Sequence, residues 1–209
     1  MNLIFDLDGT LLYTLEDLRT AVNFSLKKFS FPTKTTEEIC AAVGDGLKML
    51  MHRSLPSGTS LDVEALALQE MKRYYTLHCM DQTKPYHGII ELLHQLKSDG
   101  HTLCIVSNKA HGLVQTLKEK YFDGLIDLAL GESDRNAKKP SPDMARACMK
   151  TFGNDAIYIG DSEVDVLTAK NAKIPCICVT WGYRSEKQLF ANGAEKIAHS
   201  PAELYEFIK

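Results

Sequence analysis

Two aspartates directly follow a short apolar segment at the start of the chain. Asn2–Phe5 is predicted to be a strand, and Asp6-Leu7-Asp8-Gly9-Thr10 comes after it. Residues two apart on an extended chain point the same way, so Asp6 and Asp8 can face one site. Two such carboxylates do not both ionise cheaply unless a cation lies between them or one keeps a proton. The pair therefore suits a metal-bound nucleophile beside an acid.

The same pair has simpler interpretations. A polar turn after a buried strand would look alike in sequence, with Gly9 permitting a sharp change of chain direction. A calcium-binding loop fits less well, because Gly9 comes too early. In addition, the twelfth residue counted from Asp6 is Asp17 rather than a bidentate Glu.

A second acidic motif follows another predicted strand. Ala156–Ile159 leads into Gly160-Asp161, and Asp165 lies one helical turn after Asp161. If this strand neighbours the first, Asp161 meets the first two aspartates where ligands bind in open α/β sheets. Three hard oxygen ligands indicate magnesium rather than zinc. The alternative is that Asp161 caps the following helix and Asp165 is solvated in its first turn.

Two further motifs could bind phosphate. Ser107-Asn108 follows the predicted strand Thr102–Val106, where a small hydroxyl and free backbone N–H groups can cradle a phosphate. Lys139 precedes a Pro-Ser-Pro turn, and its charge could neutralise a transferring phosphoryl group and the Asp6 carboxylate. Ordinary turn chemistry explains the first motif equally simply, and a solvated lysine before a helix explains the second.

The elements that must position these residues alternate between strands and helices. Near-continuous apolar runs of four or five residues are typical of strands buried on both faces. The predicted strands are Asn2–Phe5, Thr102–Val106, Ile126–Leu130, Ala156–Ile159 and Cys176–Val179. Helical apolar spacing between these runs predicts an α/β fold with a doubly wound, Rossmann-like parallel sheet.

One region breaks the alternation and is predicted to be a small helical cap. We place the cap at residues 15–81 and the catalytic core at residues 1–14 and 82–209. Thr14 with Asp17, and Thr35 with Glu38, resemble helix N-caps with acidic partners three residues later. A further helix is predicted from about residue 62 to 77.

Composition excludes some classes of function. The 209 residues suffice for a core and a small accessory domain, and the net charge of −3 gives no reason to expect nucleic acid or an anionic membrane surface as a partner. The first ten residues lack the pattern of a secretion leader, so we expect none, and no apolar run is long enough to span a membrane. The six cysteines form no C-x-x-C pair, which favours reduced thiols and a cytoplasmic location.

Taken together, the four motifs resemble the haloacid dehalogenase superfamily, and more narrowly its phosphoglycolate phosphatase-like branch. The residues that carry the finer resemblance are Pro85-Tyr86-His87-Gly88, Ser107-Asn108-Lys109, Lys139-Pro140-Ser141-Pro142, Gly160-Asp161-Ser162, Trp181-Gly182-Tyr183 and the cap loop Val43-Gly44-Asp45-Gly46. The resemblance covers nearly the whole chain. It implies a magnesium-dependent phosphatase that hydrolyses a small phosphorylated metabolite through an aspartyl-phosphate.

The resemblance also implies a role for each motif residue. Asp6 would be the nucleophile and Asp8 the acid/base, with Lys139 neutralising charge. Substrate would be bound by Ser107, Asn108, Lys139 and Gly44. Mg²⁺ would be held by Asp6, Asp161 and the backbone carbonyl of Asp8, with Asp165 supporting these ligands from behind.

Some departures from the family pattern leave the leaving group open. Tyr13-Thr14 stands where Asp-Ser is usual, and Asn171-Ala172-Lys173 replaces a small Ala-Ala-Gly stretch. A sugar phosphomutase would share every core motif, and a non-enzymatic binding or regulatory protein can share the fold. A dehalogenase fits poorly because it would lack a carboxylate at position 8.

Overall fold

The computed structural model describes all residues, 1–209, and the chain divides into two units. The first, here named the sheet unit, comprises Met1–Tyr13 and Pro85–Lys209. The second, the helical unit, comprises Thr14–Lys84 and interrupts the first shortly after its opening strand. No helix combines the length and the apolar character that crossing a membrane requires.

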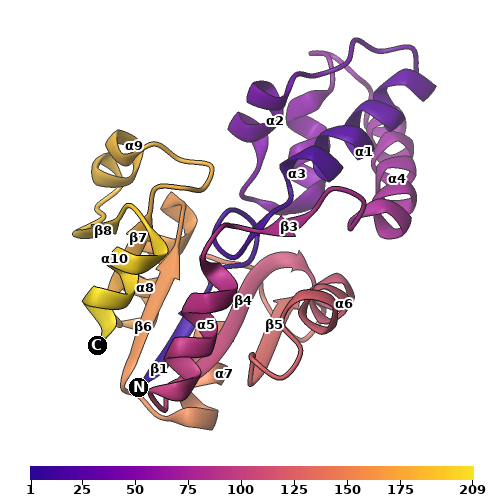
Figure 1. Cartoon of the computed structure of the whole chain (residues 1–209). Coiled ribbons are helices and arrows are strands. Elements are labelled where there is room, and N and C mark those ends of the chain that lie inside the picture. The colour runs from indigo at the N-terminus through magenta and orange to yellow at the C-terminus, as the bar shows by residue number, and fades with distance from the viewer. The chain divides into compact units, whose positions relative to one another are not determined.

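A parallel sheet of six strands forms the centre of the sheet unit (Figure 1). Its strands are β1 (Asn2–Phe5), β4 (Thr102–Ala110), β5 (Leu128–Glu132), β6 (Ala156–Gly160), β7 (Cys176–Val179) and β8 (Lys196–Ala198). The order across the sheet is β5-β4-β1-β6-β7-β8, so the winding direction reverses at β1. Leu3, Ile4 and Phe5 of β1 are fully buried, because helices cover both faces of the sheet. The predicted doubly wound α/β fold is confirmed.

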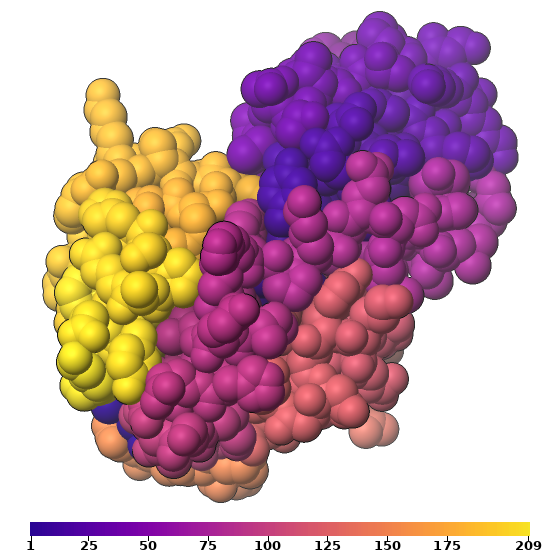
Figure 2. All heavy atoms as spheres, in the orientation of Figure 1, coloured from indigo at the N-terminus to yellow at the C-terminus, as the bar shows by residue number.

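Six helices accompany this sheet. They are α5 (Ile89–Ser98), α6 (His111–Tyr121), α7 (Asp143–Phe152), α8 (Glu163–Ala172), α9 (Glu186–Ala191) and α10 (Pro201–Ile208). The apolar side of α7, with Met144 and Cys148, packs against Ile4 and Val106 in the core. On the other face, α10 lies beside α5, as the yellow and magenta atoms of Figure 2 show.

Two details of the sheet differ from the sequence-based expectation. The strand expected at Ile126–Leu130 begins at Leu128, because Leu125 and Ile126 are buried in the preceding turn rather than in the sheet. The edge strand β8 was not predicted. Its three residues, Lys196 to Ala198, are too few to give a periodic signal.

The helical unit contains α1 (Leu15–Lys28), α2 (Thr36–Ala42), α3 (Gly46–Ser54) and α4 (Leu61–His78). The helix α1 packs on α4, and the Ser25 hydroxyl donates a hydrogen bond of 2.7 Å to the backbone carbonyl of Ala67. The predicted cap of α2 is confirmed. Thr35 Oγ1 accepts from the backbone N–H of Glu38, whose carboxylate accepts from the backbone N–H of Thr35.

Thr14 is the N-cap residue of α1 as predicted, but the expected capping partnership with Asp17 is wrong. The Thr14 side chain makes no capping hydrogen bond to α1. Instead, the buried Asp17 carboxylate accepts from the backbone N–H groups of Gln82 (3.0 Å) and Thr83 (2.9 Å) and from the Thr83 hydroxyl (2.7 Å). Asp17 therefore joins the beginning of the helical unit to its end.

The chain leaves and re-enters the sheet unit through two short strands. β2 (Leu12–Tyr13) and β3 (Lys84–Pro85) pair with each other, and the backbone N–H of Tyr86 donates to the carbonyl of Leu11 at 3.2 Å. The two crossings are consequently neighbours in space.

We predict that Asp17→Ala lowers the free energy of unfolding by about 2–4 kcal/mol, because it leaves the buried donors of Thr83 and the backbone donor of Gln82 without their charged acceptor. Urea unfolding followed by far-UV circular dichroism measures this. The matched control is Asp62→Ala, an exposed aspartate in the first turn of α4, with an expected cost below about 1 kcal/mol. Equal losses in the two variants would contradict the assignment.

Candidate active site

The carboxyl ends of β1, β4 and β6 bring the predicted site residues together. In the sheet register Phe5 lies opposite both Ile105 and Ile159, so β1 and β6 end at about the same level while β4 continues past them to Ala110. The backbone N–H of Asp6 donates to the carbonyl of Ile159 at 2.8 Å and continues the pairing by one residue. Because parallel strands share one carboxyl edge, residues far apart in the sequence meet there.

Lys139 lies between two carboxylates in the interior. Its Nζ is 2.7 Å from Asp6 Oδ1 and 2.8 Å from Asp165 Oδ1, and its side chain is only 3% exposed. Burial by itself lowers the pKa of Lys139, but the charges of Asp165 and Asp6 outweigh this and raise its pKa above the ordinary value. Lys139 is therefore a permanent cation in the site.

Asp6 is under opposing influences. Burial raises the pKa of its carboxyl, Lys139 lowers it, and the neighbouring charges of Asp165 and Asp161 raise it again, so that it ends well above the usual value. Both hydrogen bonds to the Asp6 carboxylate, from Lys139 and from the backbone N–H of Leu7 at 2.7 Å, are made to Oδ1. This leaves Oδ2 as the oxygen that is free to react.

Asn108 fixes the backbone of Lys139. Its Oδ1 accepts from the Lys139 backbone N–H at 2.6 Å, and its Nδ2 donates to the Lys139 carbonyl at 3.2 Å. The sequence pattern predicted a substrate-binding role for Asn108. The structure shows that its side-chain amide is engaged with Lys139.

A break in the sheet register places Asn108 and the residue after it. Ser107 lies opposite Gly131 and Ala110 lies opposite Glu132, so β4 contains two extra residues, Asn108 and Lys109. Such irregularities redirect side chains at sheet ends. Gly131 makes this one possible, because a Cβ there would lie 2.5 Å from the Lys109 carbonyl oxygen.

Lys109 is the site residue that the sequence reasoning missed. Its Nζ is 2.6 Å from Asp8 Oδ1, and the lysine side chain is only 4% exposed. The motif Ser107-Asn108-Lys109 is visible in the sequence. The direction of the Lys109 side chain, however, depends on the register break in β4, which a single sequence does not indicate. Ser107 itself is buried, and its hydroxyl accepts from the Lys109 backbone N–H at 3.2 Å.

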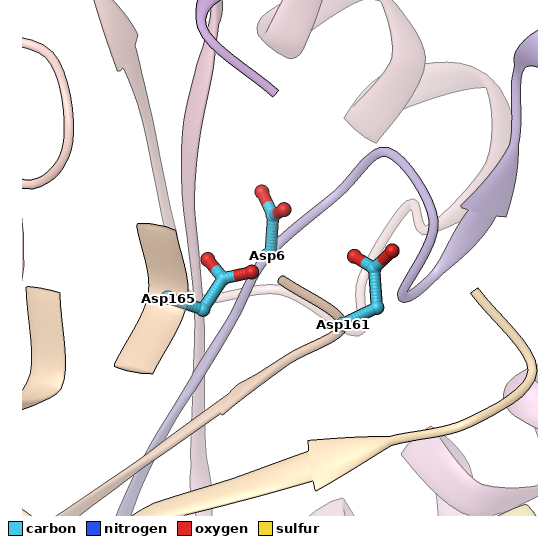
Figure 3. Close-up of side chains that lie close together, drawn as sticks. All are labelled: Asp6, Asp161 and Asp165. Carbon is cyan, nitrogen blue, oxygen red and sulfur yellow. The ribbon is translucent and has the colours of Figure 1, made fainter. Parts of the chain in front are cut away.

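Three buried carboxylates form an acidic cluster (Figure 3). Asp6, Asp161 and Asp165 each offer an oxygen atom, and these oxygens all lie within 4.8 Å of one another. Burial, and secondly the charge of Asp165, raise the pKa of Asp161 to about 7. Grouped hard oxygen atoms that repel one another are the donor set that a hard divalent cation requires. The cluster therefore fits a metal ion.

The members of the cluster have different partners. Asp161 accepts from the Thr10 hydroxyl at 3.1 Å and from the backbone N–H of Tyr183 at 2.7 Å. Asp165 accepts from Lys139 and from both the backbone N–H and the hydroxyl of Ser162, at 3.1 and 2.6 Å. Asp165 is fully buried, so the alternative of a solvated residue is wrong, and the N-cap of α8 is Ser162 rather than Asp161.

Two glycines make room for Asp161. Gly9 has φ = +88°, and a side chain on it would collide with the Asp161 carboxylate. A Cβ on Gly182 would collide with Asp161 and with the Gly9 carbonyl. The loop that contains Gly182 is tied down by Trp181, whose indole N–H donates to the Thr10 carbonyl at 3.0 Å.

The remaining predicted residues lie apart from this cluster. The Asp8 carboxylate binds Lys109 and does not join the cluster. Gly44 belongs to the helical unit, where it has φ = +128° in the turn between α2 and α3.

Comparison with known proteins identifies the family to which this chain is similar. Residues 3–179 match the model of the haloacid dehalogenase-like hydrolases. Over 206 residues the chain is 33% identical to a phosphoglycolate phosphatase of Caulobacter vibrioides, which covers 95% of this chain and 86% of the relative. It is 34% identical to a phosphoglycolate phosphatase of Mannheimia succiniciproducens, over 86% of this chain and 85% of the relative.

Solved structures agree with these relatives. A crystal structure described as a candidate phosphoglycolate phosphatase from Lactobacillus delbrueckii superposes with a TM-score of 0.94 at 34% identity and covers 99% of this chain and 97% of its own. The chain belongs to the haloacid dehalogenase-like hydrolase family. The predicted resemblance to its phosphoglycolate phosphatase-like branch and the predicted class, a phosphatase, are confirmed.

The raised pKa of Asp161 predicts how stability depends on pH when divalent metal is removed. The pKa of Asp161 is about 7 in the folded chain, against 3.8 for an unperturbed aspartate, so the folded state binds an extra proton between these pH values. Stability therefore falls as pH rises through this window.

Asp161→Asn removes the ionisable group, and its amide can still pair with Thr10 and Tyr183. In chelator, we expect the variant to be more stable than wild type at pH 8, by up to about 4 kcal/mol, with the advantage disappearing near pH 4. Urea unfolding at the two pH values measures this. A variant less stable than wild type at pH 8 would refute the prediction.

Proposed function

We propose that this enzyme hydrolyses a small phosphomonoester, phosphoglycolate or a phosphorylated hydroxy acid like it, through an aspartyl-phosphate on Asp6. The observation that carries the proposal is the position of Asp6. It is buried between the ammonium group of Lys139 and the carboxylates of Asp161 and Asp165, with Oδ2 free of hydrogen bonds. The named relatives are phosphoglycolate phosphatases, which supports the choice of ester.

The first step in this mechanism transfers the phosphoryl group. Asp6 Oδ2 forms a bond to phosphorus while the ester P–O bond breaks, and Asp8 gives its proton to the departing alkoxide. Lys139, held by Asn108, stabilises the charge that develops around the phosphoryl group. Ser107 and the backbone N–H groups at the end of β4 are proposed to bind phosphate oxygens.

The second step regenerates the enzyme. Asp8 accepts a proton from water, the hydroxide oxygen bonds to phosphorus, and the bond between phosphorus and Asp6 breaks. The products are inorganic phosphate and free Asp6, and the proton taken by Asp8 replaces the one lost in the first step. Asp8 thus acts as acid and then as base.

We propose Mg²⁺ as the metal ion of the site. Asp6, Asp161 and the backbone carbonyl of Asp8 would hold it, and Asp165 would keep Lys139 and the start of α8 in place behind them. Bound there, the ion would neutralise phosphate charge during transfer. The all-oxygen donor set supports magnesium over zinc.

Two further parts of the proposal concern the leaving group and the location of the protein. The role of Gly44 in choosing the leaving group is proposed from the family resemblance. A cytoplasmic location is proposed because all six cysteines are free thiols in the structure, which is typical of proteins from reducing compartments.

The proposal predicts that Asp6→Asn reduces the hydrolysis of phosphoglycolate to below about one thousandth of the wild-type rate, because the amide is a poor nucleophile. Phosphate release in the presence of Mg²⁺ measures this, and chelator should abolish the wild-type rate in the same way. The exposed Asp123→Asn is the matched control and should retain full activity.

Two results would contradict the proposal. One is activity that survives both chelator and Asp6→Asn, which excludes the aspartyl-phosphate. The other is isomerisation of a hexose phosphate without net release of phosphate, which would identify a sugar phosphomutase.

A further inference from the structure

Lys109 is a buried cation to which the proposed reaction has given no task. Its side chain is 4% exposed, and its Nζ contacts Asp8 Oδ1 at 2.6 Å. The other buried cation at the strand ends, Lys139, contacts Asp6 and Asp165 instead. Each lysine therefore contacts a different reactive aspartate. Lys139 contacts the proposed nucleophile Asp6, and Lys109 contacts the proposed acid/base Asp8.

The backbone around Lys109 is arranged for this contact. The register break in β4 supplies Asn108 and Lys109 as extra residues, and Gly131 leaves space for the Lys109 carbonyl. The Lys109 backbone N–H is held by the Ser107 hydroxyl. The register break thus directs the side chains of two neighbouring residues to different partners. Asn108 binds the Lys139 backbone, and Lys109 binds the Asp8 carboxylate.

The Asp8 carboxylate needs such a restraint. It is more exposed than the other site carboxylates, at 21% of its side chain, and Lys109 Nζ is its only hydrogen-bond donor in the structure. Because Lys109 occupies Oδ1, Oδ2 remains to exchange a proton. Without this contact the side chain of Asp8, which directly precedes Gly9, would rotate freely. Its carboxylate would then spend little time in the geometry that proton transfer requires.

We propose that Lys109 is a positioning residue that holds Asp8 as the base for the water step, so that its loss slows hydrolysis of the aspartyl-phosphate more than formation of it. This inference rests on the proposed function. An ester with a good leaving group separates the two steps, because 4-nitrophenolate departs without a proton from Asp8, whereas water still needs a base.

The test is rapid mixing of 4-nitrophenyl phosphate and Mg²⁺ with Lys109→Met, which keeps the apolar stem and removes the charge. We expect a burst of about one nitrophenolate per enzyme, followed by turnover about 10–100-fold slower than wild type. Acid quenching should recover phosphate bound covalently to the variant during turnover. Lys120→Met, an exposed lysine of α6, is the matched control and should behave as wild type.

Other outcomes would overturn the inference. Turnover within twofold of wild type means that Lys109 does not assist Asp8. A burst slowed as much as turnover, or a raised KM with unchanged kcat, means that Lys109 binds phosphate or only supports the fold. Hydrolysis that survives both chelator and Asp6→Asn in the otherwise wild-type enzyme refutes the proposed function itself and is distinguishable from these results.

A double-mutant cycle distinguishes an effect of Lys109 through Asp8 from a general disturbance of the structure. With Asp8→Asn already present, Lys109→Met should slow turnover by no more than about twofold further, because the base that it positions is gone. Independent losses that multiply in the double variant would show that Lys109 acts elsewhere.

Discussion

The contact of one buried ammonium group with two buried carboxylates is the constraint that shapes this site. Lys139 lies between Asp6 and Asp165 with almost no exposure to water, and removing either kind of partner would leave an uncompensated charge in the interior. Three clustered carboxyl groups have only one lysine among them, so the cluster holds more acidic groups than cations to pair with them. The same arrangement therefore holds the nucleophile still and favours a cation beside it. Asn108 and Ser162 serve this arrangement by fixing the partners, and Gly9 and Gly182 by leaving room for Asp161.

The parallel sheet makes the constraint achievable with short side chains. Because Phe5 of β1 pairs with Ile105 of β4 and Ile159 of β6, Asp6, Ser107 and Asp161 all come one or two residues after the same level of the sheet, and short side chains suffice there. The lysines come from less regular backbone, one from the loop before α7 and the other from the register break at the end of β4. Asp6 and Asp161 thus directly follow strands and Asp165 lies in the first turn of α8, whereas the two lysines lie in segments whose paths are set by individual hydrogen bonds.

Much of the fold and part of the site could be predicted from the sequence, for identifiable reasons. Apolar runs mark β1, β6 and β7 because strands buried on both faces must be apolar throughout. The meeting of Asp6 with Asp161 follows from the rule that parallel strands share a carboxyl edge. The partner of Lys109 could not be predicted, since it depends on two extra residues in one strand and a glycine in its neighbour. Asp17 was misassigned for a related reason. Its local pattern fits a helix cap, but its hydrogen-bond donors lie more than sixty residues later in the chain.

The pairing of β2 with β3 has a consequence for how the chain tolerates insertion. The chain enters and leaves the helical unit through the paired strands β2 and β3. For the sheet unit, the helical unit is therefore equivalent to a loop whose two ends are held together. The entropy lost on closing such a loop grows only with the logarithm of its length, by about 0.6 kcal/mol for each doubling. A longer, shorter or differently folded insert at this point would change the stability of the catalytic sheet very little. The length of the inserted segment can therefore change at this anchor with little cost to the sheet that carries the acidic cluster.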